Sequence, residues 1–224
     1  MYTLYIGNKN YSSWSLRPWL LLRVAGIPFE ERAVALTGQG PSEVHRAYSP
    51  SGLVPCLHDG EVRVWDSLAI AEYLAERHAG LWPEAPAARA FARSMSAEMH
   101  GGFTALRGTW VMNAKLAFAE RAPPESVQRE VDRIVQLWTT CRAAPAAAGG
   151  PFLFGRFGIA DAMYAPVALR FRTYAARLPD AAAAYRDALL ALPAMQEWIS
   201  AALAETAVEE RYDRLAREAG GSPR

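Results

Sequence analysis

The pattern of apolar and polar positions divides the chain into two unlike parts. In the first third, Tyr2 to Ile6 alternates like a half-buried strand, Trp19 to Ala25 forms an apolar helical run, and Phe29 to Leu36 predicts a second strand. Apolar runs on both sides of Asp59-Gly60 predict a tight hairpin. A helix follows from Ser67, a good N-cap residue, to about His78.

After residue 88 the strand signal fades and helical periodicity dominates. Residues 79–88, which contain Gly80, Pro83 and Pro86, are a predicted linker. The predicted helices beyond it cover residues 89–118, 124–144, 159–177, 181–190, 194–204 and 205–219. We therefore expect an α+β/α protein of two domains, with a small mixed domain in residues 1–78 and an all-α helical bundle in residues 89–224.

Composition and charge narrow the class of protein. Hydrophobic residues make up 51% of the 224 residues, which supports a sizeable core. The 24 Lys and Arg residues are balanced by 23 Asp and Glu, so the basic surface that binds nucleic acid is missing. Neither an apolar run of about 18 residues nor a signal-peptide pattern is present, so we expect a cytoplasmic protein that does not cross a membrane. Cys56 and Cys141 lack CxxC spacing, which argues against a disulfide framework and a metal site.

A serine-rich turn, residues 12–18, lies between the first predicted strand and the first predicted helix. Pro18 limits this helix, because proline lacks a backbone N–H, so the helix is expected to begin near Trp14 or Ser15. Helix N-termini carry unpaired N–H groups and a partial positive charge, which favour anions and favour a thiolate over a thiol. Since both cysteines lie elsewhere, a thiolate bound at this turn would come from a ligand.

Three ordered motifs resemble the glutathione transferase superfamily. Residues 12–17, Ser-Ser-Trp-Ser-Leu-Arg, are similar to the Ser-Ser-Cys-Ser-Trp-Arg of the zeta class, which includes maleylacetoacetate isomerases. Residues 49–55 are similar to the family's Asn-Pro-x-x-x-Val-Pro, and residues 66–74 resemble its Glu/Gln/Asp-Ser-x-Ala-Ile-x-x-Tyr-Leu. More loosely, Gly158 to Asp161 is similar to its Ser/Thr-x-x-Asp folding signal. The resemblance implies a thioredoxin-like first domain with a mixed four-stranded sheet, an all-α second domain, reduced glutathione as co-substrate, and a homodimer.

The resemblance also implies which hydroxyl stabilises the thiolate of glutathione. The zeta pattern places it at Ser12, and the spacing of other serine-type classes makes Ser13 the next candidate. Tyr5 and Tyr11 are rival hydroxyls, because some classes use a tyrosine near the first strand; we interpret Tyr5 as a packed strand residue and Tyr11 as lining the site. We interpret Ser15 as the cap of the first helix.

Further motif positions are expected to hold the glutathione backbone. The resemblance implies a cis Val54-Pro55 bond, with the backbone of Val54 pairing with the cysteinyl backbone of glutathione. Asp66 suits the ammonium of the γ-glutamyl end, while Ser67 and the helix start suit its carboxylate. The candidates for the glycine end remain unranked: Lys9, Gln39, His45 and Arg46.

The resemblance also implies that the first helix of the helical domain lines the pocket for the second substrate. Its predicted face contains Met99, Phe103 and Trp110, which with Arg107 are pocket candidates beside Tyr11 and Trp14. We interpret His100 as a satisfied core or interface histidine. Arg17 is expected either to pair with a carboxylate of the first domain or to reach the site, and we favour the structural role.

Three functions fit these patterns. The first is a glutathione transferase whose thiolate attacks a small electrophile, as in detoxification. The second is glutathione-dependent cis–trans isomerisation of a maleyl compound, which the zeta-like serines favour and Trp14, in place of the zeta cysteine, argues against. The third is a non-catalytic protein-binding module, which the serine turn and the Asp66-Ser67 pair argue against.

Overall fold

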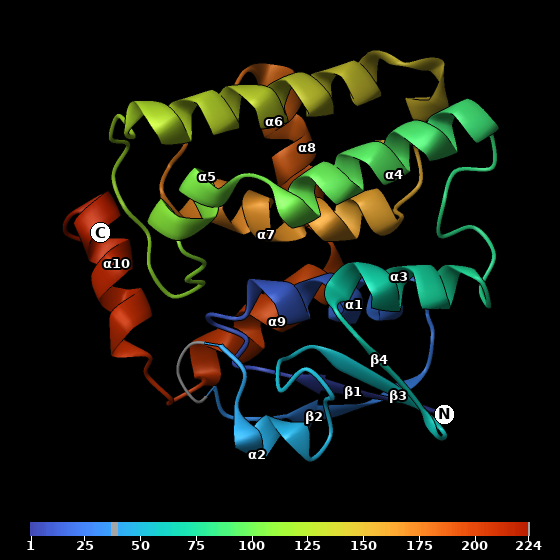
Figure 1. Ribbon diagram of the computed structural model, residues 1–224. Coiled ribbons are helices and arrows are strands. Elements are labelled where there is room, and N and C mark those ends of the chain that lie inside the picture. Colours follow the sequence, from blue (N-terminus) through green and yellow to red (C-terminus); the bar gives the residue numbers. More distant parts are fainter. Residues whose placement is uncertain (37–39, 224) are drawn as a thin grey trace.

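The computed structural model describes residues 1–36 and 40–223, and its first domain is a mixed sheet with helices on both faces (Figure 1). The strand order is β2-β1-β3-β4. β1 (Tyr2–Ile6) is parallel to β2 (Phe29–Ala33) and antiparallel to β3 (Cys56–Asp59), and β3 forms a hairpin with β4 (Val62–Trp65). The predicted thioredoxin-like domain with a four-stranded mixed sheet is confirmed, although β2 ends at Ala33 and not at Leu36.

Three helices complete this domain: α1 (Ser13–Val24), α2 (Glu43–Arg46) and α3 (Ser67–Ala75). α1 and α3 lie between the sheet and the helical domain, while α2 lies on the opposite side (Figure 1). Two predicted caps are wrong. The side chain of Ser12, and not of Ser15, accepts the N–H at the start of α1, and Asp66, with a φ of 75°, caps α3 in place of Ser67. In each case the capping residue lies immediately before the first helical residue, which brings its side-chain oxygen within reach of the free N–H groups.

The second domain is entirely helical, as expected. Its elements are α4 (Pro86–Gly101), α5 (Thr104–Thr109), α6 (Glu125–Ala143), the short 3-10 helix η1 (Pro145–Ala147), α7 (Ile159–Thr173), α8 (Asp180–Leu190), α9 (Pro193–Ala204) and α10 (Glu210–Gly220). α4 begins inside the predicted linker, and α10 begins later than the predicted helix over 205–219.

The single helix predicted over residues 89–118 is wrong, because the chain breaks at Gly102 and Phe103. Gly102 is extended and Phe103 adopts a left-handed φ of 53°. A Cβ on Gly102 would lie 2.7 Å from the carbonyl oxygen of Glu98, so only glycine fits this turn. The carboxylate of Glu130 on α6 then accepts the N–H groups of Ala105 and Leu106, which starts α5 in a new direction.

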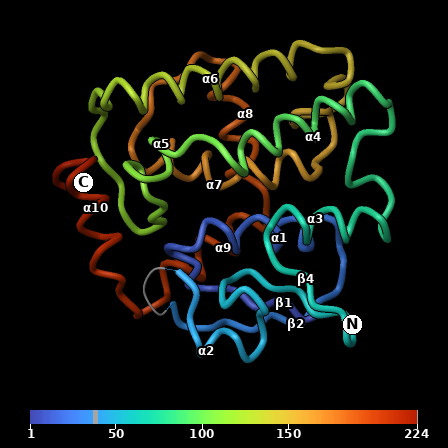
Figure 2. The backbone as a smooth tube through the Cα atoms, in the orientation of Figure 1, coloured from blue at the N-terminus to red at the C-terminus, as the bar shows by residue number. Residues whose placement is uncertain are grey.

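A continuous core joins the two domains. α7, buried along nearly its whole length, packs against both α1 and α4. α9 returns to the first domain beside α1 (Figure 2). There Trp198 Nε1 donates to the carbonyl oxygen of Lys9 at 2.9 Å. Within residues 1–36 and 40–223, no helix combines the length and apolar character that a membrane crossing requires.

Candidate functional site

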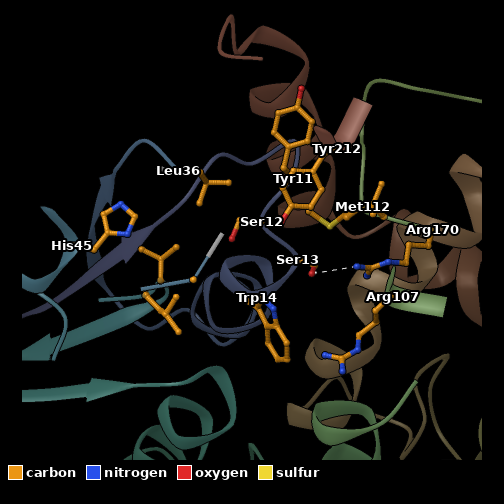
Figure 3. Close-up of a pocket in the computed structure, with 14 residues that line it drawn as sticks. Tyr11, Ser12, Ser13, Trp14, Leu36, His45, Arg107, Met112, Arg170 and Tyr212 are labelled. Atoms are coloured by element: carbon orange, nitrogen blue, oxygen red, sulfur yellow. Dashed lines mark hydrogen bonds between the residues drawn. The ribbon is translucent and has the colours of Figure 1, made fainter. Parts of the chain in front are cut away.

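A cavity of about 360 Å³ opens between the N-terminal end of α1 and the helical domain (Figure 3). The turn before α1 forms its centre, with His45 on one side and Arg107 and Arg170 on the other (Figure 3). The lining residues are Tyr11, Ser12, Ser13, Trp14, Leu36, Gly40, His45, Leu53, Val54, Arg107, Val111, Met112, Arg170 and Tyr212. Because both domains contribute, the cavity suits a ligand or ligand pair that contacts both.

The serine turn places two predicted hydroxyls at this cavity. Ser12 Oγ accepts the N–H of Ser15 at 3.3 Å and donates to Ser15 Oγ at 2.8 Å. Ser15 Oγ in turn accepts the N–H of Gly7 at 3.1 Å. Ser13 Oγ accepts a hydrogen bond from Arg170 Nη2 at 3.3 Å, so its own hydroxyl hydrogen is available to a ligand.

The rival tyrosines lie in different places. Tyr11 lines the cavity, and its hydroxyl donates to Asp213 of α10 at 3.1 Å. Tyr5 stacks on Tyr48 with ring centroids 4.4 Å apart, outside the cavity lining.

Burial raises the pKa of the neighbouring Cys56 thiol, which therefore stays protonated at neutral pH.

Arg170 is a cavity residue that the sequence reasoning missed. It is buried in the last turn of α7, and its Nε donates to the carbonyl oxygen of Trp110 at 2.6 Å. Burial lowers its pKa to about 10, so the guanidinium remains charged at neutral pH. The sequence signal for Arg170 was a charged residue inside the mostly apolar run from Ile159 to Phe171. A charged side chain is rarely fully buried unless it is paired with another polar group.

Arg17 is buried beneath Trp14, with its guanidinium carbon 4.3 Å from the ring centroid. The carboxylate pairing expected from the sequence is not what the structure shows, because Arg17 Nη1 donates to Ser67 Oγ at 3.4 Å. Its Nε has no hydrogen-bond partner among the described residues. Burial, together with the positive charges of Arg170 and Arg107, lowers its pKa to about 9.

The start of α3 holds the second cluster of polar groups. Asp66 Oδ1 accepts the N–H groups of Leu68 at 2.8 Å and Ala69 at 3.4 Å. His100 of α4 reaches the same carboxylate, so the interpretation of His100 as an interface histidine is consistent with its position. Val54, before the cis peptide bond to Pro55, lines the cavity from the first domain.

Three pocket candidates lie outside the cavity lining. Met99, Phe103 and Trp110 are buried in the helical core, because the break after Gly101 separates the face that one continuous helix would have presented. Of the unranked candidates for the glycine end, His45 lines the cavity. Lys9 pairs with Glu31 and Arg46 with Glu43, while Gln39 lies outside the described residues. Over residues 1–36 and 40–223, no cluster of His, Cys, Asp and Glu is placed to hold a metal ion.

Two family models match the chain. The N-terminal domain of glutathione S-transferase matches residues 11–77, and the C-terminal domain of glutathione S-transferase matches residues 124–217. The two matches include the cavity residues of the first domain together with Arg170 and Tyr212, while Arg107, Val111 and Met112 lie between them. The chain therefore belongs to the glutathione S-transferase superfamily.

Individual relatives agree with this family. A probable maleylacetoacetate isomerase of Vibrio cholerae serotype O1 is 33% identical over 131 residues, or 54% of this chain and 60% of that protein. A dichloromethane dehalogenase of Methylorubrum extorquens is 43% identical over 60 residues, or 25% of this chain and 21% of that protein. The matches thus span less than two thirds of these curated relatives. The theta class glutathione S-transferase of Xanthomonas axonopodis pv. citri, solved with glutathione bound, is 27% identical, with a TM-score of 0.62 over 90% of this chain and 98% of that one.

Proposed function

We propose that this protein is a glutathione transferase, which binds reduced glutathione as its thiolate and directs the sulfur at a small electrophile. The observation that carries the proposal is the position of Ser12 and Ser13, at the N-terminus of α1 and on the wall of a cavity shared by both domains. A free thiol is mostly protonated at neutral pH, so the site must favour its anion.

A chain of hydrogen bonds supports Ser12 as the donor to sulfur. In the structure Ser12 donates to Ser15, whose oxygen also accepts the N–H of Gly7. With a thiolate in the cavity, the two hydroxyl hydrogens reverse, so that Ser15 donates to Ser12 and Ser12 donates to the sulfur. The N–H of Gly7 keeps the oxygen of Ser15 paired throughout, and each bond polarises the next. The partial positive charge of the α1 N-terminus adds to this stabilisation.

The start of α3 supports the placement of the γ-glutamyl end. Asp66 supplies a carboxylate for the ammonium group, and the Ser67 hydroxyl with the buried Arg17 supplies donors for the carboxylate. The unpartnered Nε of Arg17 fits this role, because a buried guanidinium gains most from an anionic partner. The backbone of Val54 on the cavity wall would then pair with the cysteinyl residue.

Isothermal titration calorimetry with reduced glutathione tests this placement. We expect saturable binding to the wild type and about tenfold weaker binding to Asp66→Asn, which keeps the cap but removes the negative charge. Asp187→Asn is the matched control, because Asp187 is exposed on α8 and, among the described residues, forms its ion pair with its neighbour Arg186. Absence of binding to the wild type would contradict the proposed function.

The arginines favour a second candidate reaction, glutathione-dependent cis–trans isomerisation of a maleyl compound. Arg107 and Arg170 line the cavity wall facing the serine turn, where they could hold the carboxylates of such a substrate. The relative from Vibrio cholerae, a probable maleylacetoacetate isomerase, supports this candidate.

Incubation with maleylacetone and glutathione separates the two reactions. If the protein is an isomerase, Arg107→Gln should raise KM for maleylacetone about tenfold, since one charged hydrogen-bond donor is lost. Arg129→Gln, on the exposed side of α6, is the control and should leave KM unchanged. No isomer formation by the wild type eliminates this candidate and leaves conjugation standing.

A further inference from the structure

His100 connects the helical domain to the carboxylate expected to bind glutathione. It lies in the last turn of α4, and its Nε2 is 2.9 Å from Asp66 Oδ2 and 3.0 Å from Asp66 Oδ1. The two residues are 34 positions apart and belong to different domains. Oδ1 is already held by the N–H groups of Leu68 and Ala69, so His100 fixes the remaining rotation of the carboxylate.

The groups around His100 decide its charge. Its ring meets the edge of Trp14 with centroids 5.4 Å apart, and the guanidiniums of Arg17 and Arg107 lie over that same indole at 4.3 and 5.2 Å. Burial lowers the pKa of His100, and the two arginines lower it further against the opposing effect of Asp66. The imidazole is therefore neutral at neutral pH, and the proton on Nε2 is donated to Asp66. Its Nδ1 is buried and has no hydrogen-bond partner among the described residues.

We propose, on the basis of the proposed function, that His100 is a positioning residue for glutathione: neutral, it holds Asp66 toward the γ-glutamyl ammonium, and protonated, it competes with that ammonium. A carboxylate has about four acceptor positions, so Asp66 accepts from its two backbone donors and from His100 and still accepts from the ligand. A neutral donor leaves the full negative charge of Asp66 to the ammonium. An imidazolium shares that charge and also repels the ligand's cation.

The acidic side of the pH profile follows from this competition. As the pH falls below neutrality, His100 becomes protonated beside Asp66, and affinity for the ammonium-bearing ligand declines. The charged groups that face it are Asp66 at the start of α3, which raises its pKa, and Arg17 on α1 and Arg107 on α5, which lower it.

The experiment uses S-methylglutathione, because a ligand without a thiol removes the pH dependence of thiolate formation. A second probe is the same peptide with a glutaryl group in place of γ-glutamyl, which lacks only the ammonium. Calorimetric affinities are measured at about pH 5 and about pH 7, where the carboxyl groups of the ligand stay ionised. The variants are His100→Leu and His100→Gln, since the glutamine amide can donate as neutral histidine does but cannot be protonated. His78→Gln, three residues beyond the end of α3, is the matched control, because His78 contacts Tyr2 and not Asp66.

For the wild type we expect S-methylglutathione to bind several-fold more weakly at about pH 5 than at about pH 7. His100→Leu should bind about tenfold more weakly than the wild type at neutral pH, and His100→Gln should restore most of that affinity without the acid-side decline. The wild type, His100→Leu and His100→Gln should bind the glutaryl probe with equal affinity. His78→Gln should match the wild type with both probes and at both pH values.

The outcomes separate the inference from the function on which it rests. Failure of the wild type to bind glutathione itself would overturn the proposed function. Normal wild-type binding with an unchanged affinity in His100→Leu, or an equal loss toward the glutaryl probe, would overturn the role of His100. If His100→Leu does not fold, the pH profile of His100→Gln decides: an acid-side decline equal to that of the wild type contradicts the inference.

Discussion

Ser12 has two roles at the same atom, because its oxygen caps α1 while its hydroxyl hydrogen is the proposed donor to sulfur. Ser12→Ala should therefore lower kcat/KM for conjugation of a chlorinated aromatic substrate about 100-fold, as loss of one donor to a developing anion does elsewhere. It should also lower the free energy of unfolding by about 1 kcal/mol through loss of the cap. Steady-state kinetics and urea denaturation measure the two effects separately.

Ser13→Ala and Ser15→Ala complete this comparison. Ser13 accepts from Arg170 and does not belong to the hydrogen-bond chain, so its loss should cost less activity than the loss of Ser12. Ser15→Ala removes the relay behind Ser12 and should give an intermediate loss. Full activity in Ser12→Ala combined with a severe loss in Ser13→Ala would transfer the role to Ser13.

The sequence located part of the cavity wall and missed the rest for a physical reason. Ser12, Ser13 and Trp14 are contiguous at a helix start, so local chemistry was enough to bring them together at the cavity. Arg170 is brought there only by packing of α7 against α1, which no local pattern records. Its hydrogen bond to Ser13 joins positions 157 residues apart.

At the scale of elements, the ends of helices were harder to predict than their existence. Every predicted helix beyond residue 120 has a counterpart in the structure, because apolar periodicity persists over several turns. The break at Gly102 was not predicted, since it depends on the distant Glu130 accepting the first N–H groups of α5. Met99, Phe103 and Trp110 lie in the core around that break, while Arg107 lies on the cavity wall.

The start of α7 is stabilised by the buried Asp161, which accepts from Gly158 N at 3.0 Å, Leu153 N at 3.1 Å and Tyr185 Oη at 2.9 Å. Burial raises the pKa of Asp161 to about 6 despite these donors, which act to lower it. Because the folded pKa exceeds the unfolded value of about 4, its contribution to stability is present below about pH 4 and is lost as the pH rises through about 6.

Urea denaturation of the wild type and Asp161→Asn at several pH values tests this pH dependence of the contribution of Asp161 to stability. The stability of the wild type relative to Asp161→Asn should fall by on the order of 3 kcal/mol between about pH 4 and about pH 6. Tyr185→Phe should shift this fall to higher pH, because the tyrosine hydroxyl lowers the pKa of Asp161. A relative stability that rises with pH over this interval would show that the carboxylate is favoured in the folded protein.

At the scale of the whole molecule, the site exists only where two domains meet. The first domain supplies the serine turn and the start of α3, and the helical domain supplies His100, Arg107 and Arg170. The continuous core through α1 and α7 fixes these groups relative to one another. The homodimer implied by the family resemblance stays a prediction, which light scattering of the purified protein tests.

The central claim is that this interface binds glutathione and ionises its thiol. The most direct measurement is the ultraviolet absorbance of the thiolate as the complex of wild-type protein and glutathione is titrated with base. We expect the pKa of the bound thiol to lie at least one unit below its ordinary value of about 8.5, and Ser12→Ala to return it most of the way. A bound thiol that titrates at its ordinary pKa would contradict the account.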